Sequence, residues 1–299
     1  MARKIEELVQ QFLDQLNRMH YQHFYIDGMQ PGVDFRSIRL EIEDDPAKRK
    51  PIPILLSTGW GSGWEGILPL AFSLACRGYR VILVSLPGYG DSENPPRRYY
   101  REHLYRHHAQ AVLAVLRNFG ISKAYFVGHS MGAEILAEAA WYSSEICEKL
   151  VLFHPTGLKK IGFFEKFSLF WKFTVSGARL RWKHYRGLDG CDKAFEVLIK
   201  FCGEQRSPWW GRFGQRWAEF SQICQGGLIK RVKEIKSKII FISGSQDTVY
   251  NAWKSRNILI EALTKEGFKA NIIFDNPHNP TLYHSERTAN IIVRRLSGA

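Results

Sequence analysis

The sequence lacks the features that mark membrane and exported proteins. No stretch of the 299 residues approaches the roughly 18 apolar residues that a membrane-spanning helix requires. The chain starts with Met1-Ala2-Arg3-Lys4 and continues with glutamates, where a signal peptide would have an apolar core. These absences predict a cytoplasmic location.

Cysteine is scarce, and its arrangement argues against two kinds of cross-link. The 5 cysteines are an odd number and include no Cys-x-x-Cys pair. This pattern is typical of reduced thiols, and it argues against both a disulfide framework and a structural zinc site.

Acidic residues are too few to balance the basic ones, and the excess lies mostly in one segment. The net charge is +13, from 42 Lys and Arg against 29 Asp and Glu. Residues 158–236 hold 17 basic and 7 acidic side chains, a balance of +10, interleaved with aromatic residues. Such a surface can bind an anionic membrane or an anionic partner, or it can be a solvated face. Because no nucleic-acid recognition motif accompanies the charge, we expect no nucleic-acid binding.

The most informative motif is the pentapeptide 128–132, Gly-His-Ser-Met-Gly. An apolar strand pattern over residues 124–127 precedes it, and a helical pattern over residues 133–140 follows it. A strand, a sharp turn with a central serine and a helix form the context of a nucleophile elbow. Such a turn is too tight for side chains two places either side of the serine, which explains both glycines. The helix N-terminus would stabilise an oxyanion beside Ser130.

The chain also supplies a candidate acid and base in the expected order. Asp247 and His278 follow the last two predicted strands, at the end of the sheet where Ser130 lies. Asp247 can orient the histidine by accepting its N–H, and His278 can take the proton of Ser130. A turn aspartate and a solvated loop histidine are the alternatives. His284 is the competing histidine, which we expect to cap or pack against the last helix.

A glycine-rich loop supplies a candidate second oxyanion donor. The strand pattern over residues 51–58 opens into Gly59-Trp60-Gly61, where backbone N–H groups can approach a bound oxygen. The N–H of Trp60 would pair with that of Met131. A plain turn is the alternative, and the loop lacks the spacing of a phosphate-binding loop.

The predicted elements alternate in a way that indicates an α/β architecture. Strand patterns cover residues 22–26, 36–42, 51–58, 79–85, 124–127, 149–153, 238–243 and 270–274. From the third strand onward helices alternate with strands, which predicts a mostly parallel eight-stranded sheet covered on both faces. Active sites of such sheets lie at the carboxyl ends of the strands. Residues 1–20 have the apolar spacing of an amphipathic helix.

One connection is too long for a simple crossover. The segment between the sixth and seventh strands spans residues 154–237, whereas a parallel crossover needs only about a dozen residues. We therefore predict a helical cap over residues 158–236 and a core formed by residues 21–157 and 237–299. Helical patterns in the cap cover residues 163–174, 192–202 and 211–224. Its aromatic residues suggest an apolar acyl pocket, with many of the rings forming the cap's own core.

Taken together, these motifs resemble those of the α/β-hydrolase superfamily over residues 36–295. The markers are Gly59-Trp60-Gly61, Leu86-Pro87-Gly88-Tyr89-Gly90-Asp91-Ser92, the elbow, Gly244-x-x-Asp247-x-Val249 and His278-Asn279-Pro280. The resemblance implies Ser130 as nucleophile, His278 as base, Asp247 as acid and the N–H groups of Trp60 and Met131 as oxyanion hole.

Within the superfamily, the first two markers look most like carboxylesterases that cleave short acyl esters, including carrier-protein esters. Thr58, Ser85 and Pro277 stand where the superfamily usually has His, Asp and Gly. Because the nucleophile position is serine, the chain differs from the dehalogenases and epoxide hydrolases of this fold, which use aspartate there.

We therefore predict a serine hydrolase that cleaves a carboxylic ester in an acyl-bearing substrate through an acyl-enzyme. The prediction requires no metal and no organic cofactor. A C–C bond hydrolase or an acyltransferase with the same triad stays open, as does a non-catalytic ligand-binding protein.

Overall fold

The computed structural model describes several segments of the chain between residues 20 and 298. The described residues are 20–25, 34–40, 50–61, 67–84, 86–89, 92, 104–158, 160–171, 213–235, 238–246, 270–277 and 285–298. The predicted helices over residues 1–20 and 192–202 lie outside them, and the domain boundaries of the sequence analysis stay predictions.

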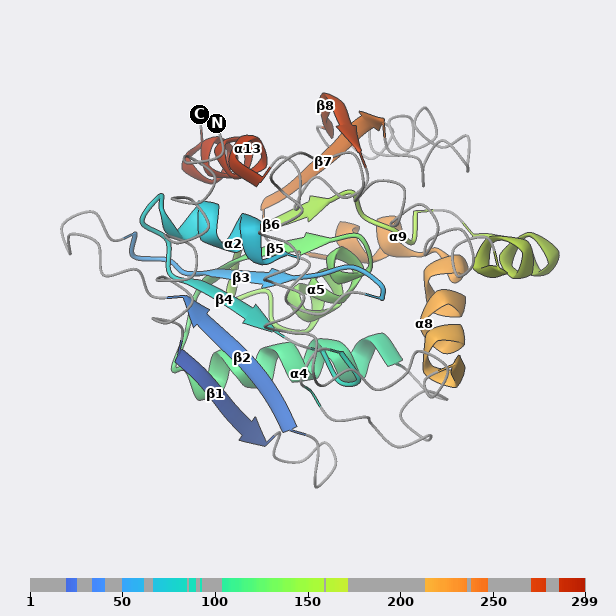
Figure 1. Ribbon diagram of the computed structural model, residues 1–299, viewed down its shortest axis with the longest axis horizontal. Helices are drawn as coiled ribbons and strands as arrows, with labels where there is room; N and C mark the ends of the chain where they lie inside the picture. The colour runs from blue at the N-terminus through green and yellow to red at the C-terminus, as the bar shows by residue number, and fades with distance from the viewer. Residues whose placement is uncertain are drawn as a thin grey trace, which may run out of the picture.

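The described strands form one eight-stranded sheet in the order β1-β2-β4-β3-β5-β6-β7-β8 (Figure 1). They are β1 (His20–Tyr25), β2 (Asp34–Leu40), β3 (Ile54–Ser57), β4 (Val81–Val84), β5 (Ala124–His129), β6 (Cys147–Phe153), β7 (Lys238–Gln246) and β8 (Ala270–Pro277). From β4 to β8 every neighbouring pair is parallel, whereas β1 and β2 join the edge antiparallel. Each predicted strand segment overlaps one of these strands.

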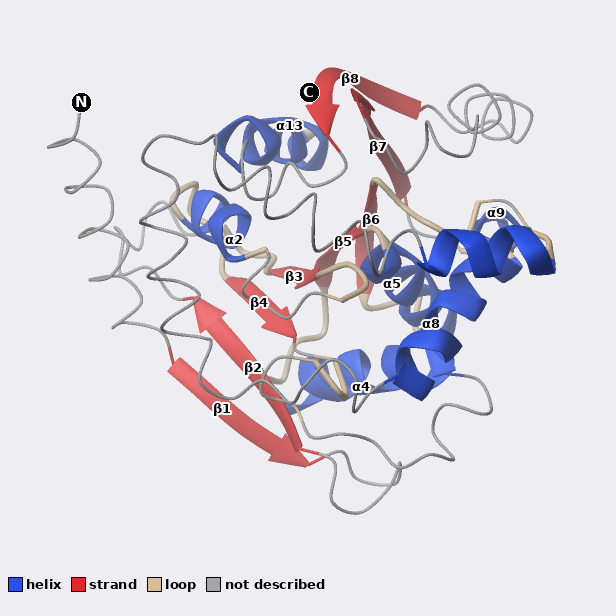
Figure 2. Cartoon of the chain, turned by 45° about the vertical axis from the view of Figure 1, so that its right-hand side comes forward, coloured by secondary structure: helices blue, strands red, loops and turns tan. Residues whose placement is uncertain are grey.

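Helices cover both faces of the sheet (Figures 1 and 2). The named helices are α2 (Leu68–Ala75), α4 (Leu104–Asn118), α5 (Met131–Tyr142), α8 (Phe213–Gln225), α9 (Leu228–Lys233) and α13 (Ser285–Ser297). Helices α2 and α13 lie on one face, and α4 and α5 lie on the other. The central strands β3 and β4 read Ile-Leu-Leu-Ser and Val-Ile-Leu-Val and are buried at every position, as a strand with helices on both sides must be.

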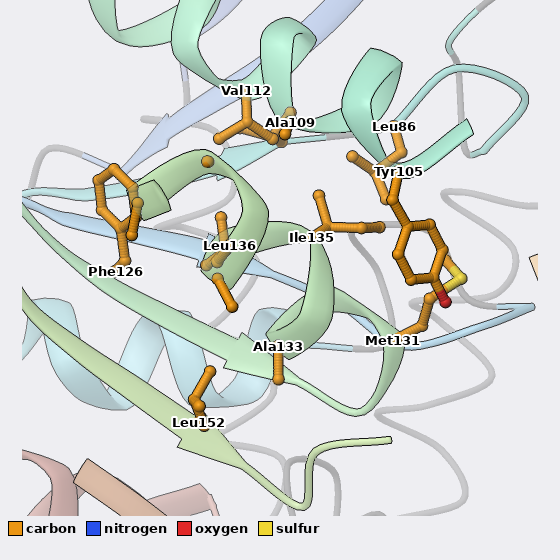
Figure 3. Packing of buried hydrophobic residues seen from close by; sticks show 14 of the residues in the cluster. Leu86, Tyr105, Ala109, Val112, Phe126, Met131, Ala133, Ile135, Leu136 and Leu152 are labelled. Carbon is orange, nitrogen blue, oxygen red and sulfur yellow. The ribbon is translucent and has the colours of Figure 1, made fainter. Parts of the chain in front are cut away.

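Two hydrophobic clusters form the core, one on each face of the sheet. Figure 3 shows part of the cluster between the sheet and helices α4 and α5, with Ala109 and Val112 of α4 near Ile135 and Leu136 of α5. Ala133, Ala137 and Ala140 of α5 belong to the same cluster. The second cluster joins the opposite face of the sheet to α2 and α13. The Nη2 atom of Arg77 lies 3.0 Å from Glu286 Oε2, which ties the end of α2 to α13.

Between β6 and β7 the described residues contain three helices, which are residues 163–171, α8 and α9. The first and second overlap the helices predicted over residues 163–174 and 211–224. Helix α8 contacts α4, and α9 contacts α5. None of the helices in the described part of the chain is both long and apolar enough to cross a bilayer.

Candidate active site

Ser130 lies at the turn that joins β5 to α5, in a backbone conformation that side chains rarely adopt. Its φ and ψ are 54° and −121°, and it precedes the first residue of α5. Its N–H donates to the carbonyl oxygen of Phe153 at 3.0 Å, which holds the turn against the end of β6. A serine with positive φ is strained, and strain of this kind concentrates at functional sites.

The two glycines of the elbow are required by close backbone contacts. A Cβ atom at Gly128 would lie 2.5 Å from the Cα of Ala133, and one at Gly132 would lie 2.4 Å from the carbonyl oxygen of Thr58. Both distances are too short for any side chain. The structure therefore confirms the tight turn that the sequence predicted around Ser130.

The glycine-rich loop after β3 runs directly beside Ser130. A Cβ atom at Gly59 would lie 2.9 Å from Ser130 Cβ and 3.4 Å from Ser130 Oγ. Trp60 follows Gly59, and Met131 follows Ser130 and is completely buried. Gly59 and Ser130 are thus in contact, and Trp60 and Met131, the residues predicted to supply the oxyanion N–H groups, come directly after them.

The predicted acid and base, Asp247 and His278, lie outside the described residues, as does the competing His284. The strands before them are described, and both are longer than predicted. Strand β7 continues to Gln246 and β8 continues to Pro277, and these two residues are register partners in the parallel pair. The described backbone therefore ends at the same level of the sheet, one residue before each predicted member of the triad.

Two buried histidines, one within the elbow and one near it, received no role in the sequence analysis. His129 precedes Ser130, and His154 follows β6 with a φ of 45° and no exposed surface. Their ring centroids are 6.3 Å apart, and the N–H of His154 donates to the carbonyl oxygen of Ile242 at 2.8 Å. The available sequence signal was a histidine directly after a buried strand, at the end of the sheet where active sites lie.

An aromatic cluster connects the glycine-rich loop after β3 to the predicted cap. The ring centroid of Trp60 lies 5.9 Å from that of Phe170 and 5.3 Å from that of Phe220. Phe170 also packs against Trp217 at 4.9 Å. Within the described part of the chain, the buried Trp60 Nε1–H has no hydrogen-bond acceptor. Trp60 thus packs with rings from helix 163–171 and α8 in an apolar cluster next to Gly59, and its Nε1–H is the one buried donor of this cluster without an acceptor among the described residues.

A second, polar cluster fastens α8 to the segment after β4. The hydroxyl of Tyr89 donates to Glu219, Arg216 Nη1 lies 3.2 Å from Glu219 Oε2, and His108 Nε2 of α4 lies 3.8 Å from Glu219 Oε1. Gln215 Nε2 donates to the carbonyl oxygen of Pro87 at 3.0 Å.

Burial alone would raise the pKa of the Glu219 carboxyl, because a charged group loses hydration. The hydrogen bonds and charges of His108 and Arg216, with the hydroxyl of Tyr89, outweigh this effect and lower the pKa below its usual value. Glu219 is therefore a carboxylate at neutral pH, compensated by the groups around it.

Glu134 is a buried carboxyl of the opposite kind. It lies on the first turn of α5, one helical turn after Ser130, and Thr156 Oγ1 donates to it. The hydroxyl of Tyr105 donates to the same oxygen at 3.4 Å. Burial raises the pKa of Glu134 to about 8, because these hydrogen bonds and the charge of Arg231 offset only part of the lost hydration. Glu134 is thus mostly protonated at neutral pH.

Comparisons with known proteins agree on the fold. Residues 52–183 match the family model described as alpha/beta hydrolase fold. A 2-hydroxy-6-oxononadienedioate/2-hydroxy-6-oxononatrienedioate hydrolase of Paraburkholderia phymatum is 33% identical over 129 residues, which are 43% of each chain. Epoxide hydrolase B of Mycobacterium tuberculosis is 28% identical over 109 residues, which are 36% of this chain and 30% of that protein. The chain thus covers less than half the length of these relatives.

Among solved structures, a thermophilic esterase from Thermogutta terrifontis superimposes with a TM-score of 0.68 at 15% identity. The superposition covers 93% of this chain and 98% of the esterase. The chain has the α/β-hydrolase fold, and the resemblance to that superfamily inferred from its motifs is confirmed.

Proposed function

We propose that the protein is a serine hydrolase that cleaves carboxylic esters through an acyl-enzyme. The observation that carries this proposal is the conformation of Ser130. Its strained backbone, the two glycines that only a tight turn requires and the contact with Gly59 match what a nucleophile elbow needs. A serine in a simple loop would need none of these features.

In the proposed mechanism, Ser130 Oγ attacks the acyl carbon while His278 takes its proton. Asp247 holds the imidazole in the required tautomer, and His278 then passes the proton to the leaving alkoxide. Water hydrolyses the acyl-enzyme by the same route. The register pairing of Gln246 with Pro277 supports this assignment, because it brings the chain to one level of the sheet before both residues.

The oxyanion of the tetrahedral intermediate would accept hydrogen bonds from the backbone N–H groups of Trp60 and Met131. Donors that are already oriented stabilise this charge without reorganisation. Met131 begins α5, so the positive end of the helix dipole adds to the stabilisation. The reaction proposed for these residues needs no metal or organic cofactor.

Labelling by a fluorophosphonate tests the proposal directly. The reagent forms a covalent bond only with an activated serine, so we expect labelling of the wild-type chain and its loss in Ser130→Ala. Ser143→Ala, at the opposite end of α5, is the matched control and should label normally. A wild-type chain that stays unlabelled would indicate a non-catalytic ligand-binding protein and contradict the proposal.

A second candidate is hydrolysis of a C–C bond beside a ketone by the same residues. The match to a protein named for an oxo-dienedioate substrate favours it. The likeness to epoxide hydrolase B is weaker support for epoxide hydrolysis. The nucleophile position here is Ser130, whereas the known epoxide hydrolases of this fold use aspartate there. Three assays separate the reactions. Turnover of p-nitrophenyl esters of graded chain length reports ester hydrolysis, cleavage of an oxo-dienedioate reports C–C hydrolysis, and product formed with an added acyl acceptor reports acyl transfer.

A further inference from the structure

The helix of residues 163–171 has one buried face and one aromatic face that is open to solvent. Leu169 and Phe170 are buried, at 8% and 3% exposure. On the other side the exposed rings are Phe163 (68%), Phe164 (88%), Phe167 (59%) and Trp171 (64%). Phe163, Phe167 and Trp171 recur every fourth residue, so they lie along one stripe of the helix, with Phe164 beside it.

This concentration of exposed rings is local. Two further large hydrophobic side chains of the described residues are markedly exposed, Trp141 and Tyr142, and both have polar contacts. Trp141 Nε1 donates to Glu234 at 2.7 Å, and Arg106 lies 5.7 Å from the ring centroid of Tyr142. Contiguous exposed apolar side chains, unlike single ones, mark an interaction surface.

The charges around these rings indicate the chemistry of the partner. Lys160 is exposed just before the helix. Lys166 lies within the helix and is half-buried: its Nζ donates to Ser221 Oγ of α8 at 3.3 Å and lies 5.6 Å from the ring centroid of Phe163 and 5.0 Å from that of Trp217. Glu165 beside it is exposed. The whole chain carries +13, and the predicted cap segment supplies most of it. Exposed aromatic rings near the exposed ammonium group of Lys160, on a segment with a large positive balance, suit the boundary of an anionic bilayer, where the rings enter the headgroup region and ammonium groups meet lipid phosphates.

We propose that helix 163–171 docks the protein reversibly on an anionic lipid surface through its aromatic face. A second copy of the chain suits this face less well, because two molecules that each carry +13 repel one another. The aromatic face is also close to the candidate active site. Phe170, on the opposite face of the same helix, packs on Trp60, so a bound lipid surface would lie one helix away from the loop beside Ser130.

Co-sedimentation with vesicles tests the proposal without any assay of catalysis. We expect the full chain to bind vesicles of phosphatidylcholine and phosphatidylglycerol, to bind pure phosphatidylcholine vesicles much more weakly and to be released by high salt. The variant Phe163→Ser/Phe164→Ser/Trp171→Ser should lose on the order of tenfold or more in partition coefficient, because binding scales with the apolar area buried. Trp141→Ser/Tyr142→Ser is the matched control, since it removes two exposed rings elsewhere, and it should bind as the wild type does.

Circular dichroism of each variant verifies folding. The single variant Phe164→Ser, which changes the most exposed ring, replaces the triple variant if that variant fails to fold. Equal binding of the wild type and the aromatic variants would overturn the proposal, as would equal binding to neutral and anionic vesicles. Absence of vesicle binding would also overturn it. In that case, self-association through these rings would assign the face to a second copy, and binding of an acidic carrier protein would assign it to a protein partner.

Discussion

The hydroxyl of Tyr89 donates a hydrogen bond to the carboxylate of Glu219, although the two residues are 130 positions apart in the sequence. Tyr89 lies after β4 and Glu219 lies on α8, and both side chains are buried. The segment 86–89, which marked the superfamily resemblance, therefore has a structural task in this protein. It holds α8, which lies between β6 and β7 in the chain, against the core through hydrogen bonds to Glu219 and Gln215.

Removal of the Glu219 charge should destabilise the protein more than removal of the Tyr89 hydroxyl. Glu219→Gln leaves the buried Arg216 without its anion, which costs about 3–5 kcal/mol. Tyr89→Phe removes one hydrogen bond to a charged group, worth about 1.5–3 kcal/mol. Urea unfolding measures both, with Tyr125→Phe, a partly buried tyrosine of β5, as control. Equal small effects of all three variants would show that the cluster contributes little to stability.

A methyl group at Gly88 should disturb α8, whereas one at Gly61 should not. Both glycines have a φ of 78°, so alanine suffers the same backbone strain at each position. A Cβ atom at Gly88 would lie 2.3 Å from Gln215 Oε1, whereas one at Gly61 would meet nothing within 4 Å. We therefore expect Gly88→Ala to lower the melting temperature more than Gly61→Ala.

The difference between these two variants isolates the Gln215 contact. Gln215 is buried and donates to Pro87, so its side chain cannot move aside without losing a hydrogen bond. In Gly88→Ala/Gln215→Ala the clash is absent, and the additional cost of the alanine at position 88 should fall to that of Gly61→Ala. Equal melting temperatures of the two single variants would contradict this account of the loop.

Glu134→Gln should remove a pH dependence of stability. Between about pH 4.5, the ordinary pKa, and about 8, the folded chain keeps a proton on Glu134 that the unfolded chain releases. The free energy of unfolding therefore falls as the pH rises through this interval. Glutamine cannot ionise, so the melting temperature of the variant should exceed that of the wild type by a few degrees near about pH 9 and match it near about pH 5.

The control for this pH dependence is Glu148→Gln. Glu148 is an exposed carboxylate that lies 3.0 Å from Lys123, and its replacement should shift stability little at any pH. Parallel pH profiles of the wild type and Glu134→Gln in thermal unfolding would show that Glu134 is not the group responsible.

The kinetic effects of the triad variants should follow the proposed roles. Ser130→Ala should reduce kcat on the order of 10⁶-fold, because the covalent route is lost. His278→Ala should cost nearly as much, and Asp247→Asn less, since the acid only orients the base. Steady-state kinetics on a p-nitrophenyl ester measures all three. Ester hydrolysis that survives in Ser130→Ala would exclude the mechanism, and an inactive His284→Ala beside an active His278→Ala would reassign the base.

The sequence by itself determined the order of elements and the position of the elbow. The aliphatic runs of β3 and β4 predict buried strands, because only a sheet covered on both faces buries every residue of a strand. The elbow is equally local, since its two glycines lie two residues either side of Ser130. Strand ends were less predictable, and β7 and β8 each continue three residues further than their apolar patterns.

Only the tertiary structure decided which distant groups meet. The pKa values of Glu134 and Glu219 move in opposite directions, although both are buried glutamates on helices, because different groups face them: the charges of His108 and Arg216 lower that of Glu219, whereas burial dominates for Glu134. The same holds for residues 163–171, where the sequence of five aromatic residues does not tell which ring packs on Trp60 and which rings face solvent. Burial and hydrogen-bond partners depend on contacts far apart in the chain, and local sequence does not encode them one residue at a time.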